Sequence, residues 1–335
     1  MLQSLVSILV PFKNTELYIS ECVNSILSQT YEHFEAIFID DSSNDASFSI
    51  VDSFAKKDNR IQLFKNNGNG IIEALRTAYN NSSGEYITRM DSDDIMTPIR
   101  LEVMLNSLKK YGRTHLAVGQ VKYFRADGLS DGFARYEKWL NQLTTTGSNY
   151  SEIYKECVIP SPCWMLHRDD LDACAGFEPN RYPEDYDLAF RFYKAGYKCI
   201  PCEEVLLHWR DYSTRTSRTH EHYAENSFLD LKVDYFLELN YDASRPLAIW
   251  GAGKKGKTLA KILIRENVPF YWICDNPKKI GKHIYDQELL NFNYLVQLNN
   301  PQSIVTVANA VAQKEITIYF EKQMMQSMID YFFFC

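Results

Sequence analysis

VSILVP, residues 6–11, is a short apolar run of the kind that forms a buried β-strand. Three similar runs follow within the first hundred residues: EAIFID (35–40), IQLFK (61–65) and EYITRM (85–90). The stretches between them have the apolar spacing of helices, at residues 17–27, 47–55 and 71–79. Strands that alternate with helices of this length indicate βαβ units and a mostly parallel sheet, so the sequence predicts an α/β fold.

The alternation continues further along the chain. Strand-like runs occur at residues 116–124 and 163–168, and helical patterns at residues 98–111 and 184–195. A polar break, YDASRP at 241–246, precedes a new strand and tight turn, LAIWGAGKKG. We therefore expect two domains, one at 1–240 and a smaller α/β domain at 241–335.

The composition agrees with a globular protein and limits its partners. The 335 residues suit two domains, and with 45% hydrophobic and 24% charged residues the chain is not disordered. Asp plus Glu exceed Lys plus Arg by 43 to 36, which argues against a general nucleic-acid binder. The scattered cysteines are typical of reduced thiols in a cytosolic protein. The chain also lacks an apolar run of about 20 residues and a signal peptide. We therefore expect a cytoplasmic protein, with possible contact at the inner face of the membrane.

Asp91 and Asp93, in the segment DSDD, come directly after the run EYITRM. Ligands of open α/β sheets bind at the carboxyl ends of the strands. Two carboxylates one residue apart can hold a divalent cation whose other ligands are water and phosphate oxygens. The alternative is an Asp-rich cap before the helix that begins near Pro98.

Asp40 and Asp41 end the second strand-like run and are followed by two serines. A carboxylate at this position can accept a hydrogen bond from a base N–H. The alternative is an ordinary Asp/Ser turn. Because both acidic strand ends belong to the same edge of one sheet, together they favour a ligand site.

Glu184 and Asp185 begin the helical pattern that follows Pro183. The helix dipole favours carboxylates in a first turn, which is a sufficient structural explanation. The same position keeps a carboxylate ionised and directed out of the helix start, as a general base requires.

Four segments together resemble family 2 of the inverting glycosyltransferases, which have the GT-A fold. They are VSILVPFKN (6–14), SILSQTYEHFEAIFIDDSSND (25–45), GEYITRMDSDD (84–94) and PEDYDLAFR (183–191). Their order and spacing match over roughly residues 1–240. GIIEALRTAY (70–79) resembles the segment before the family's metal motif, and HWRDYSTRTSRT (208–219) resembles the closing segment of one bacterial branch.

The resemblance implies roles for individual residues. Pro11, Phe12 and Asp41 would line the pocket for the donor's base, usually uracil. Asp91 would lie beside the ribose and the metal, and Asp93 would bind Mg²⁺ or Mn²⁺ on the diphosphate.

Further roles follow for residues beyond the metal motif. Asp185 would be the catalytic base, with Glu184 beside it at the acceptor. Arg76, which stands where asparagine is commoner, is placed with the donor-binding residues, and Arg215 and Arg218 would close over the diphosphate. His208 would be a further metal or phosphate contact, or else a structural histidine at a strand end.

The function implied is a metal-dependent inverting hexosyl- or N-acetylhexosaminyl-transferase. It would move a sugar from a nucleotide donor, expected to be a UDP-sugar, to a saccharide or lipid-linked saccharide acceptor in bacterial surface-glycan assembly. The chemistry agrees, because a metal offsets charge on the leaving diphosphate and one base takes the acceptor proton. The rivals are a nucleotidyltransferase and a non-catalytic nucleotide-binding scaffold; the sugar, the linkage and the oligomeric state are left open.

Gly251, Gly253 and Gly256 form a G-x-G-x-x-G pattern between a strand-like run and a helix. Asp275 ends the next strand-like run, where a ribose-binding carboxylate would lie. The segment resembles the Rossmann-like modules appended to some bacterial sugar-modifying enzymes. A nucleotide or dinucleotide site is one interpretation, and a tight turn in an assembly module is the other.

Overall fold

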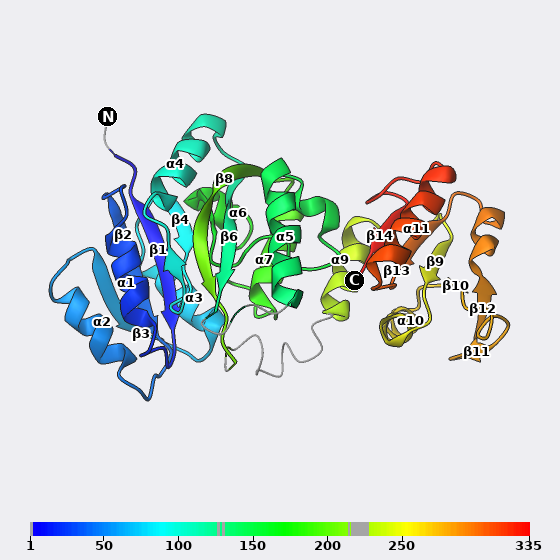
Figure 1. Cartoon of the computed structure of the whole chain (residues 1–335), viewed down its shortest axis with the longest axis horizontal. Coiled ribbons are helices and arrows are strands. Elements are labelled where there is room, and N and C mark those ends of the chain that lie inside the picture. The colour runs from blue at the N-terminus through cyan, green and yellow to red at the C-terminus, as the bar shows by residue number, and fades with distance from the viewer. Residues whose placement is uncertain (1–2, 126–127, 129–130, 214, 216–227) are drawn as a thin grey trace. The chain divides into compact units, whose positions relative to one another are not determined.

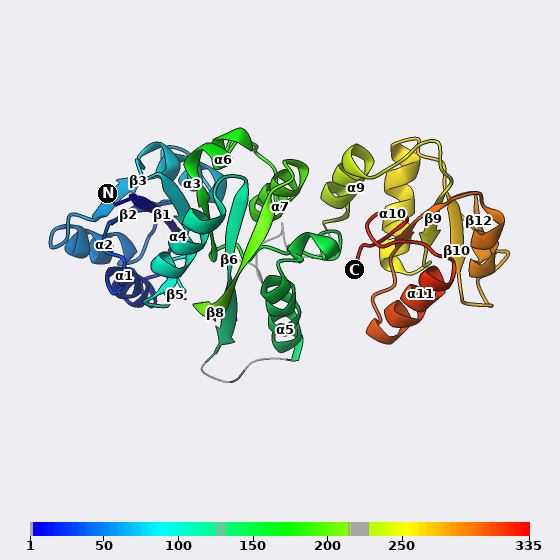
Figure 2. The same cartoon turned by 90° about the horizontal axis from the view of Figure 1, so that it is seen from above.

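The computed structural model describes residues 3–125, 128, 131–213, 215 and 228–335. The chain divides into two compact units, residues 1–149 with 158–224 and residues 150–157 with 225–335. Figures 1 and 2 label the elements of both units. No helix in the described part of the chain is both long and apolar enough to cross a membrane.

The first unit is built on an eight-stranded mixed sheet with the strand order β3-β2-β1-β4-β7-β6-β8-β5. β1 to β4 are parallel neighbours, as the sequence predicts, and β7 and β5 run antiparallel to theirs. The strands are β1 Val6–Phe12, β2 Phe34–Asp40, β3 Ile61–Lys65, β4 Tyr86–Arg89, β5 Ile95–Met96, β6 His115–Phe124, β7 Trp164–His167 and β8 Lys198–Arg210. The helices are α1 Ile19–Leu27, α2 Ser47–Ala55, α3 Ile71–Asn80, α4 Arg100–Tyr111, α5 Asp131–Thr146, α6 Arg168–Ala173 and α7 Glu184–Lys194.

The apolar periods of the sequence explain this packing. Alternate residues of β1 (Val6, Ile8 and Val10) join one core with the apolar stripes of α1 and α4. β1 and β2 are buried along their whole length, which is typical of central parallel strands covered on both faces. The strand register pairs Phe12 with Asp40, so the carboxyl ends of β1 and β2 meet at one edge of the sheet.

The second unit contains a six-stranded sheet with the order β11-β12-β10-β9-β13-β14. Only the β11–β12 pair is antiparallel among the described strands of this sheet. The strands are β9 Leu247–Trp250, β10 Tyr271–Cys274, β11 His283–Ile284, β12 Gln287–Asn291, β13 Gln302–Val305 and β14 Tyr331–Phe333. The helices are α9 Leu229–Leu239, α10 Lys254–Arg265 and α11 Ala310–Lys322, with 3₁₀ turns η1 Asn149–Glu152 and η3 Phe292–Gln297.

The second unit includes residues that the sequence pattern assigned to the first domain. α9 contacts α10, so residues 228–240 group with the second unit, and so does the segment 150–157. Tyr154 of that segment is fully buried and stacks on Phe334, with ring centroids 5.1 Å apart. The structural boundary therefore differs from residue 240, because the polar break at 241–246 is a turn between α9 and β9.

Candidate active site

Asp41 follows β2 at the acidic edge of the first sheet and is held by three donors. Its Oδ1 atom accepts hydrogen bonds from Asn66 Nδ2 at 2.7 Å and from the backbone N–H of Gly70 at 2.9 Å. Its Oδ2 atom accepts a longer bond, 3.3 Å, from Lys13 Nζ, whose side chain is half exposed. Oδ2 is thus the oxygen that a ligand donor can reach at least cost, by displacing a flexible lysine.

Pro11 and Phe12 lie at the end of β1, and both are buried. The ring of Phe12 packs edge-on against Phe38 in the core, with centroids 6.3 Å apart. Its carbonyl oxygen accepts a hydrogen bond from the N–H of Asp41 at 2.9 Å. The structure therefore brings Phe12 next to Asp41, and Pro11 pairs with Ile39 one residue earlier on β1. A ligand contact from the buried Phe12 would have to use its main chain.

The loop after β4 gathers the carboxylates of Asp91, Asp93 and Asp94. Asp93 Oδ2 accepts a hydrogen bond from Tyr212 Oη at 2.9 Å and lies 3.9 Å from Arg215 Nε. Asp94 is fully buried, and its Oδ1 atom accepts from the backbone N–H of Arg210 at 2.7 Å. No donor among the described residues reaches Asp94 Oδ2.

The carboxylates of this loop lie close enough for their charges to repel one another. Burial raises the pKa of Asp93, Arg215 opposes the rise, and Asp91 adds to it. Burial and the charge of Asp93 together raise the pKa of Asp94 well above its usual range. A divalent cation would relieve this repulsion, and carboxylate oxygens are the ligands that Mg²⁺ and Mn²⁺ prefer.

The residues present fit a cation that is completed by its substrate. Within the described part of the chain, no group of three or more His, Cys, Asp or Glu side chains is arranged to hold a metal. Asp91 and Asp93 can offer one or two carboxylates, which leaves positions for phosphate oxygens and water. Such partial ligation is typical of Mg²⁺ sites that bind together with a nucleotide diphosphate.

Arg89, the last residue of β4, joins the acidic loop to the start of α7. Its Nε atom donates to Asp91 Oδ1 at 2.9 Å, and its Nη1 atom donates to Glu184 Oε1 at 2.9 Å. Burial lowers the pKa of Arg89, but Asp91 and Glu184 outweigh that effect, so the guanidinium stays charged. The sequence motifs did not single out this arginine, although its place two residues before Asp91 was visible.

Glu184 and Asp185 occupy the first turn of α7. Among the described residues no donor reaches Glu184 Oε2, a buried atom. Asp185 is partly exposed, and its Oδ1 atom accepts from the backbone N–H of Tyr186 at 2.8 Å. Burial raises the pKa of Asp185 to about 7, Glu184 contributes to the rise, and Arg89 opposes it. A carboxylate that titrates near neutral pH is suited to accept a proton from a hydroxyl group.

The predicted arginines lie in different surroundings. Arg215 is buried beside Asp93, and its guanidinium carbon lies 5.2 Å from the centroid of the Trp209 ring. Arg218 lies outside the described residues. Arg76 of α3 donates from Nη2 to the backbone carbonyl oxygens of residues 177 and 178, at 3.1 and 2.7 Å, so this atom holds the loop before α7. Its Nη1 atom pairs with Glu73, and its buried Nε atom has no hydrogen-bond partner among the described residues.

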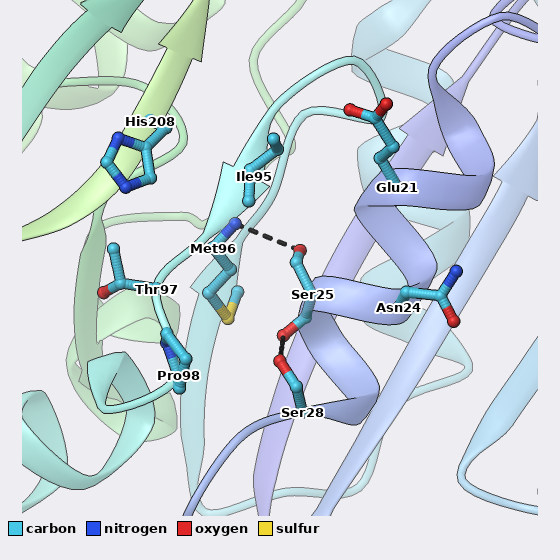
Figure 3. Close-up of a pocket in the computed structure, with 9 residues that line it drawn as sticks. All are labelled: Glu21, Asn24, Ser25, Ser28, Ile95, Met96, Thr97, Pro98 and His208. Atoms are coloured by element: carbon cyan, nitrogen blue, oxygen red, sulfur yellow. Dashed lines mark hydrogen bonds between the residues drawn. The ribbon is translucent and has the colours of Figure 1, made fainter.

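His208 on β8 lines a pocket of about 500 Å³ between α1 and the β5 segment (Figure 3). The pocket is lined by Glu21, Asn24, Ser25, Ser28, Ile95, Met96, Thr97, Pro98 and His208, and neither Asp91 nor Asp93 is among them. Burial and Lys122 lower the pKa of His208. Trp209, the next residue of β8, points to the opposite face of the sheet and packs against Arg215. The structure therefore does not bring the His208 side chain to the predicted metal ligands.

The three glycines of the turn in the second unit have different backbone conformations and surroundings. Gly251 has φ +119°, a conformation that favours glycine. A Cβ atom on Gly256 would lie 2.1 Å from Gly251 O, so the helix and the turn approach closely there. No described atom lies within 4 Å of a Cβ built on Gly253, so this position is open. Asp275 follows β10 and is exposed, and Lys279 Nζ donates to Ala252 O at 2.8 Å.

Comparisons with known proteins agree with the geometry of the first unit. Residues 7–174 match the family model described as Glycosyl transferase family 2. The chain is 36% identical over 225 residues to "Glycosyltransferase GlyG" of Streptococcus pneumoniae, covering 65% of this chain and 74% of that protein. It is 26% identical over 254 residues to "Glycosyltransferase GlyA" of the same organism, covering 73% of this chain but only 36% of that protein.

Solved structures show the same fold at low sequence identity. The crystal structure of S. aureus TarS 1-349 in complex with UDP-GlcNAc gives a TM-score of 0.54 at 18% identity, covering 79% of this chain and 72% of that one. The mannosyltransferase PcManGT from Pyrobaculum calidifontis, in complex with GDP-Man and Mn²⁺, gives 0.50 at 20% identity, covering 78% and 68%. These likenesses confirm the α/β fold of GT-A type that was expected from the sequence.

Proposed function

The chain belongs to glycosyl transferase family 2 and is a glycosyltransferase, and we propose that it is a metal-dependent inverting enzyme with a UDP-sugar as donor. Its acceptor would be a hydroxyl group of a saccharide or lipid-linked saccharide in bacterial surface-glycan assembly. The transferred group would be a hexosyl or N-acetylhexosaminyl residue. The protein would work in the cytoplasm or at the inner face of the membrane.

The Arg89 bridge is the observation that carries this proposal. One guanidinium group contacts Asp91 of the acidic loop and Glu184 of α7 at 2.9 Å each. Hydrogen bonds therefore join the candidate diphosphate site to Glu184, the residue next to the candidate base Asp185. A direct displacement needs these two parts close together, because the leaving group and the attacking hydroxyl stand on opposite sides of one carbon.

The residues of the site then have separate tasks. Asp41 Oδ2 accepts a base N–H, and Asp91 and Asp93 would hold the cation on the diphosphate. When bound, the metal ion supplies Lewis-acid stabilisation of the charge on the departing phosphate. Asp185 accepts the proton of the acceptor hydroxyl as that oxygen attacks the anomeric carbon, and Glu184 binds the acceptor beside it. One displacement with one base inverts the anomeric centre.

The donor class rests on similarity and on the geometry around Asp41. TarS is described in complex with UDP and UDP-GlcNAc, and PcManGT in complex with GDP-Man and Mn²⁺. A single carboxylate oxygen with an easily displaced partner suits the imide N–H of uracil. We favour UDP over GDP for that reason.

The second unit carries a separate candidate ligand site at the turn from Gly251 to Gly256. The open Gly253 position, at the start of α10, would let a nucleotide or dinucleotide phosphate approach the backbone N–H groups, with Asp275 on the ribose. The competing interpretation is a tight turn without a ligand. Binding of NAD⁺ or UDP that survives loss of the metal site in the first unit would favour the ligand.

The decisive experiment compares UDP binding in the wild type and in Asp93→Asn with Mn²⁺ present. Asparagine keeps the size of Asp93 and the hydrogen bond partner of Tyr212, so the fold should be retained. We expect Mn²⁺-dependent UDP affinity, measured by calorimetry, to fall by at least about 100-fold. Asp230→Asn, at an exposed aspartate of α9 in the second unit, is the matched control and should bind UDP and Mn²⁺ like the wild type.

A donor screen then tests the reaction itself. Release of free UDP, with an inverted anomeric configuration in the product, supports the proposal. Release of pyrophosphate would indicate a nucleotidyltransferase instead. UDP binding that is undiminished in Asp93→Asn and still sensitive to EDTA would contradict the metal site proposed here.

A further inference from the structure

Arg76 is bound to the segment that leads into α7. Its Nη2 atom donates to the carbonyl oxygens of Phe177 at 3.1 Å and Glu178 at 2.7 Å, and to Asn180 Oδ1 at 3.1 Å. Its Nη1 atom pairs with Glu73 on its own helix. The side chain is only 19% exposed. The planar fork of a guanidinium group can satisfy several acceptors at once, which the single ammonium of lysine cannot do in the same geometry.

A second arginine, Arg191, holds the beginning of the same segment. Arg191 of α7 donates from Nη1 to the carbonyl oxygens of Cys174 and of Gly176, the latter at 2.8 Å. Its Nε atom donates to Asp187 Oδ2 at 2.8 Å. Residues 174–180 are therefore fastened by one arginine from α7 and by one from α3. A connection of this kind leaves α7 little freedom to shift along its own axis.

The end of the segment borders both halves of the candidate site. The Tyr182 hydroxyl would be 3.2 Å from a Cβ atom built on Gly70, and the N–H of Gly70 donates to Asp41. Burial raises the pKa of Tyr182, and the charges of Glu184 and Asp41 raise it further. The chain then enters α7 with Glu184 and Asp185. If this segment is held in place, the candidate base Asp185 is held at a fixed position relative to Asp41, the candidate residue for binding the nucleotide base.

We propose that Arg76 is a positioning residue, which sets the placement of Glu184 and Asp185 through the segment 174–183. The inference rests on the proposed function of these two carboxylates. It replaces a direct donor contact for Arg76 by an indirect role, because its Nη atoms are occupied by the loop and by Glu73. A displacement of a catalytic group by about 1 Å can reduce turnover by as much as 100-fold, so a positioning residue has a measurable effect without touching substrate.

The test compares Arg76→Lys with Arg245→Lys. Arg245 of the second unit likewise donates to backbone carbonyl oxygens of a loop, from Nε to Asn300 O at 2.9 Å and from Nη2 to Pro301 O at 3.0 Å. Hydrogen exchange is followed peptide by peptide in the protein without nucleotide. UDP affinity with Mn²⁺ is measured by calorimetry, and turnover is measured with the donor that releases UDP fastest in a screen.

For Arg76→Lys we expect faster exchange confined to residues 174–183, UDP affinity within about twofold of the wild type, and turnover lower by about 10- to 100-fold. Arg245→Lys should leave exchange at 174–183 and turnover unchanged. Wild-type exchange at 174–183 in Arg76→Lys would overturn the proposal, and so would faster exchange over the whole first sheet. A tenfold or greater loss of UDP affinity would make Arg76 a donor contact. If the wild type binds no UDP, the donor assignment fails, while the exchange measurement still decides the role of Arg76.

Discussion

The two units place different kinds of residue in the loop that follows a parallel strand. After β4 the chain places Asp91, Asp93 and Asp94 in one loop, and after β9 it places the glycines of the 251–256 turn. The first loop needs cationic neighbours, and Arg89 supplies one by pairing with Asp91. The second turn needs only room, since a Cβ atom on Gly256 would meet Gly251 O. A charged strand end depends on electrostatic partners, whereas a glycine strand end depends on close packing.

This difference predicts where substitutions act on chemistry and where they act on stability. In the first unit a change of charge with little change of shape should be severe. In the second unit a change of shape should be severe, and a change of charge mild. The five predictions below test that contrast, from the largest expected effect to the smallest.

Asp185→Asn should have the largest effect on catalysis. Asparagine has nearly the same shape but cannot accept a proton, so turnover should fall by about 10²- to 10⁴-fold, as is typical when a general base is removed. UDP affinity should stay within about twofold, because the proposed role of Asp185 is at the acceptor. The measurement is the initial rate of UDP release with a confirmed acceptor. Asp230→Asn serves as the control, and near-normal turnover in Asp185→Asn would transfer the role of base to Glu184.

Tyr154→Ala should have the largest effect on the second unit. Tyr154 is fully buried, stacks on Phe334 and meets Phe236 and Phe332 edge-on, so removing its ring should cost about 3–5 kcal/mol of unfolding free energy. Denaturant unfolding with a probe in the second unit measures this. Tyr154→Phe keeps the ring but loses the hydrogen bond that the hydroxyl group donates to Asn240 Oδ1, 2.6 Å long, and should cost about 1 kcal/mol.

UDP binding should be unchanged in both Tyr154 variants. Equal costs for the two would contradict the packing described for residues 150–157. A loss of UDP affinity in Tyr154→Ala would show that donor binding depends on the second unit.

Much of the fold could be predicted because its signals are local. The runs at residues 6–11 and 35–40 lie within β1 and β2, since continuous apolar runs are typical of buried parallel strands. The acidic motifs were visible as short patterns at strand ends. The contact between Arg89 and Glu184 was not, because it joins residues 95 positions apart and depends on how β4 and α7 pack. The place of Tyr154 in the second unit was hidden for the same reason.

The pH dependence of the reaction gives a third test, with an effect of about tenfold per pH unit. Burial raises the pKa of Asp185 to about 7, with a contribution from Glu184, so the base is protonated at lower pH. The value of kcat/KM should rise about tenfold per unit up to pH 7 and then level off. A rate that is already maximal at pH 5 would contradict the assignment.

Stability should depend on the same group with a known sign. Between the ordinary aspartate pKa of about 3.9 and the raised value, the folded state binds more protons than the unfolded state. The free energy of unfolding should therefore fall as the pH rises from about 4 to about 7, and remain level with respect to this group above that range. Asp185→Asn should lack that part of the slope in denaturant titrations at several pH values.

The smallest effect is expected for Gly253→Ala, and its pairing with Gly256→Ala tests the glycine turn directly. Gly253 has φ −83°, and no described atom lies within 4 Å of a Cβ placed on it, so alanine should change the unfolding free energy by less than about 0.5 kcal/mol. Gly256→Ala would bring Cβ to 2.1 Å from Gly251 O and should destabilise the second unit strongly. Both should leave Mn²⁺-dependent UDP binding by the first unit unchanged.

If the turn holds a phosphate, the methyl group of Gly253→Ala stands where the phosphate approaches, so binding of NAD⁺ or UDP by the second unit should be lost without loss of stability. Unchanged nucleotide binding in Gly253→Ala would contradict the phosphate site, and the turn would then need glycine only at Gly251, for its positive φ, and at Gly256, for close packing.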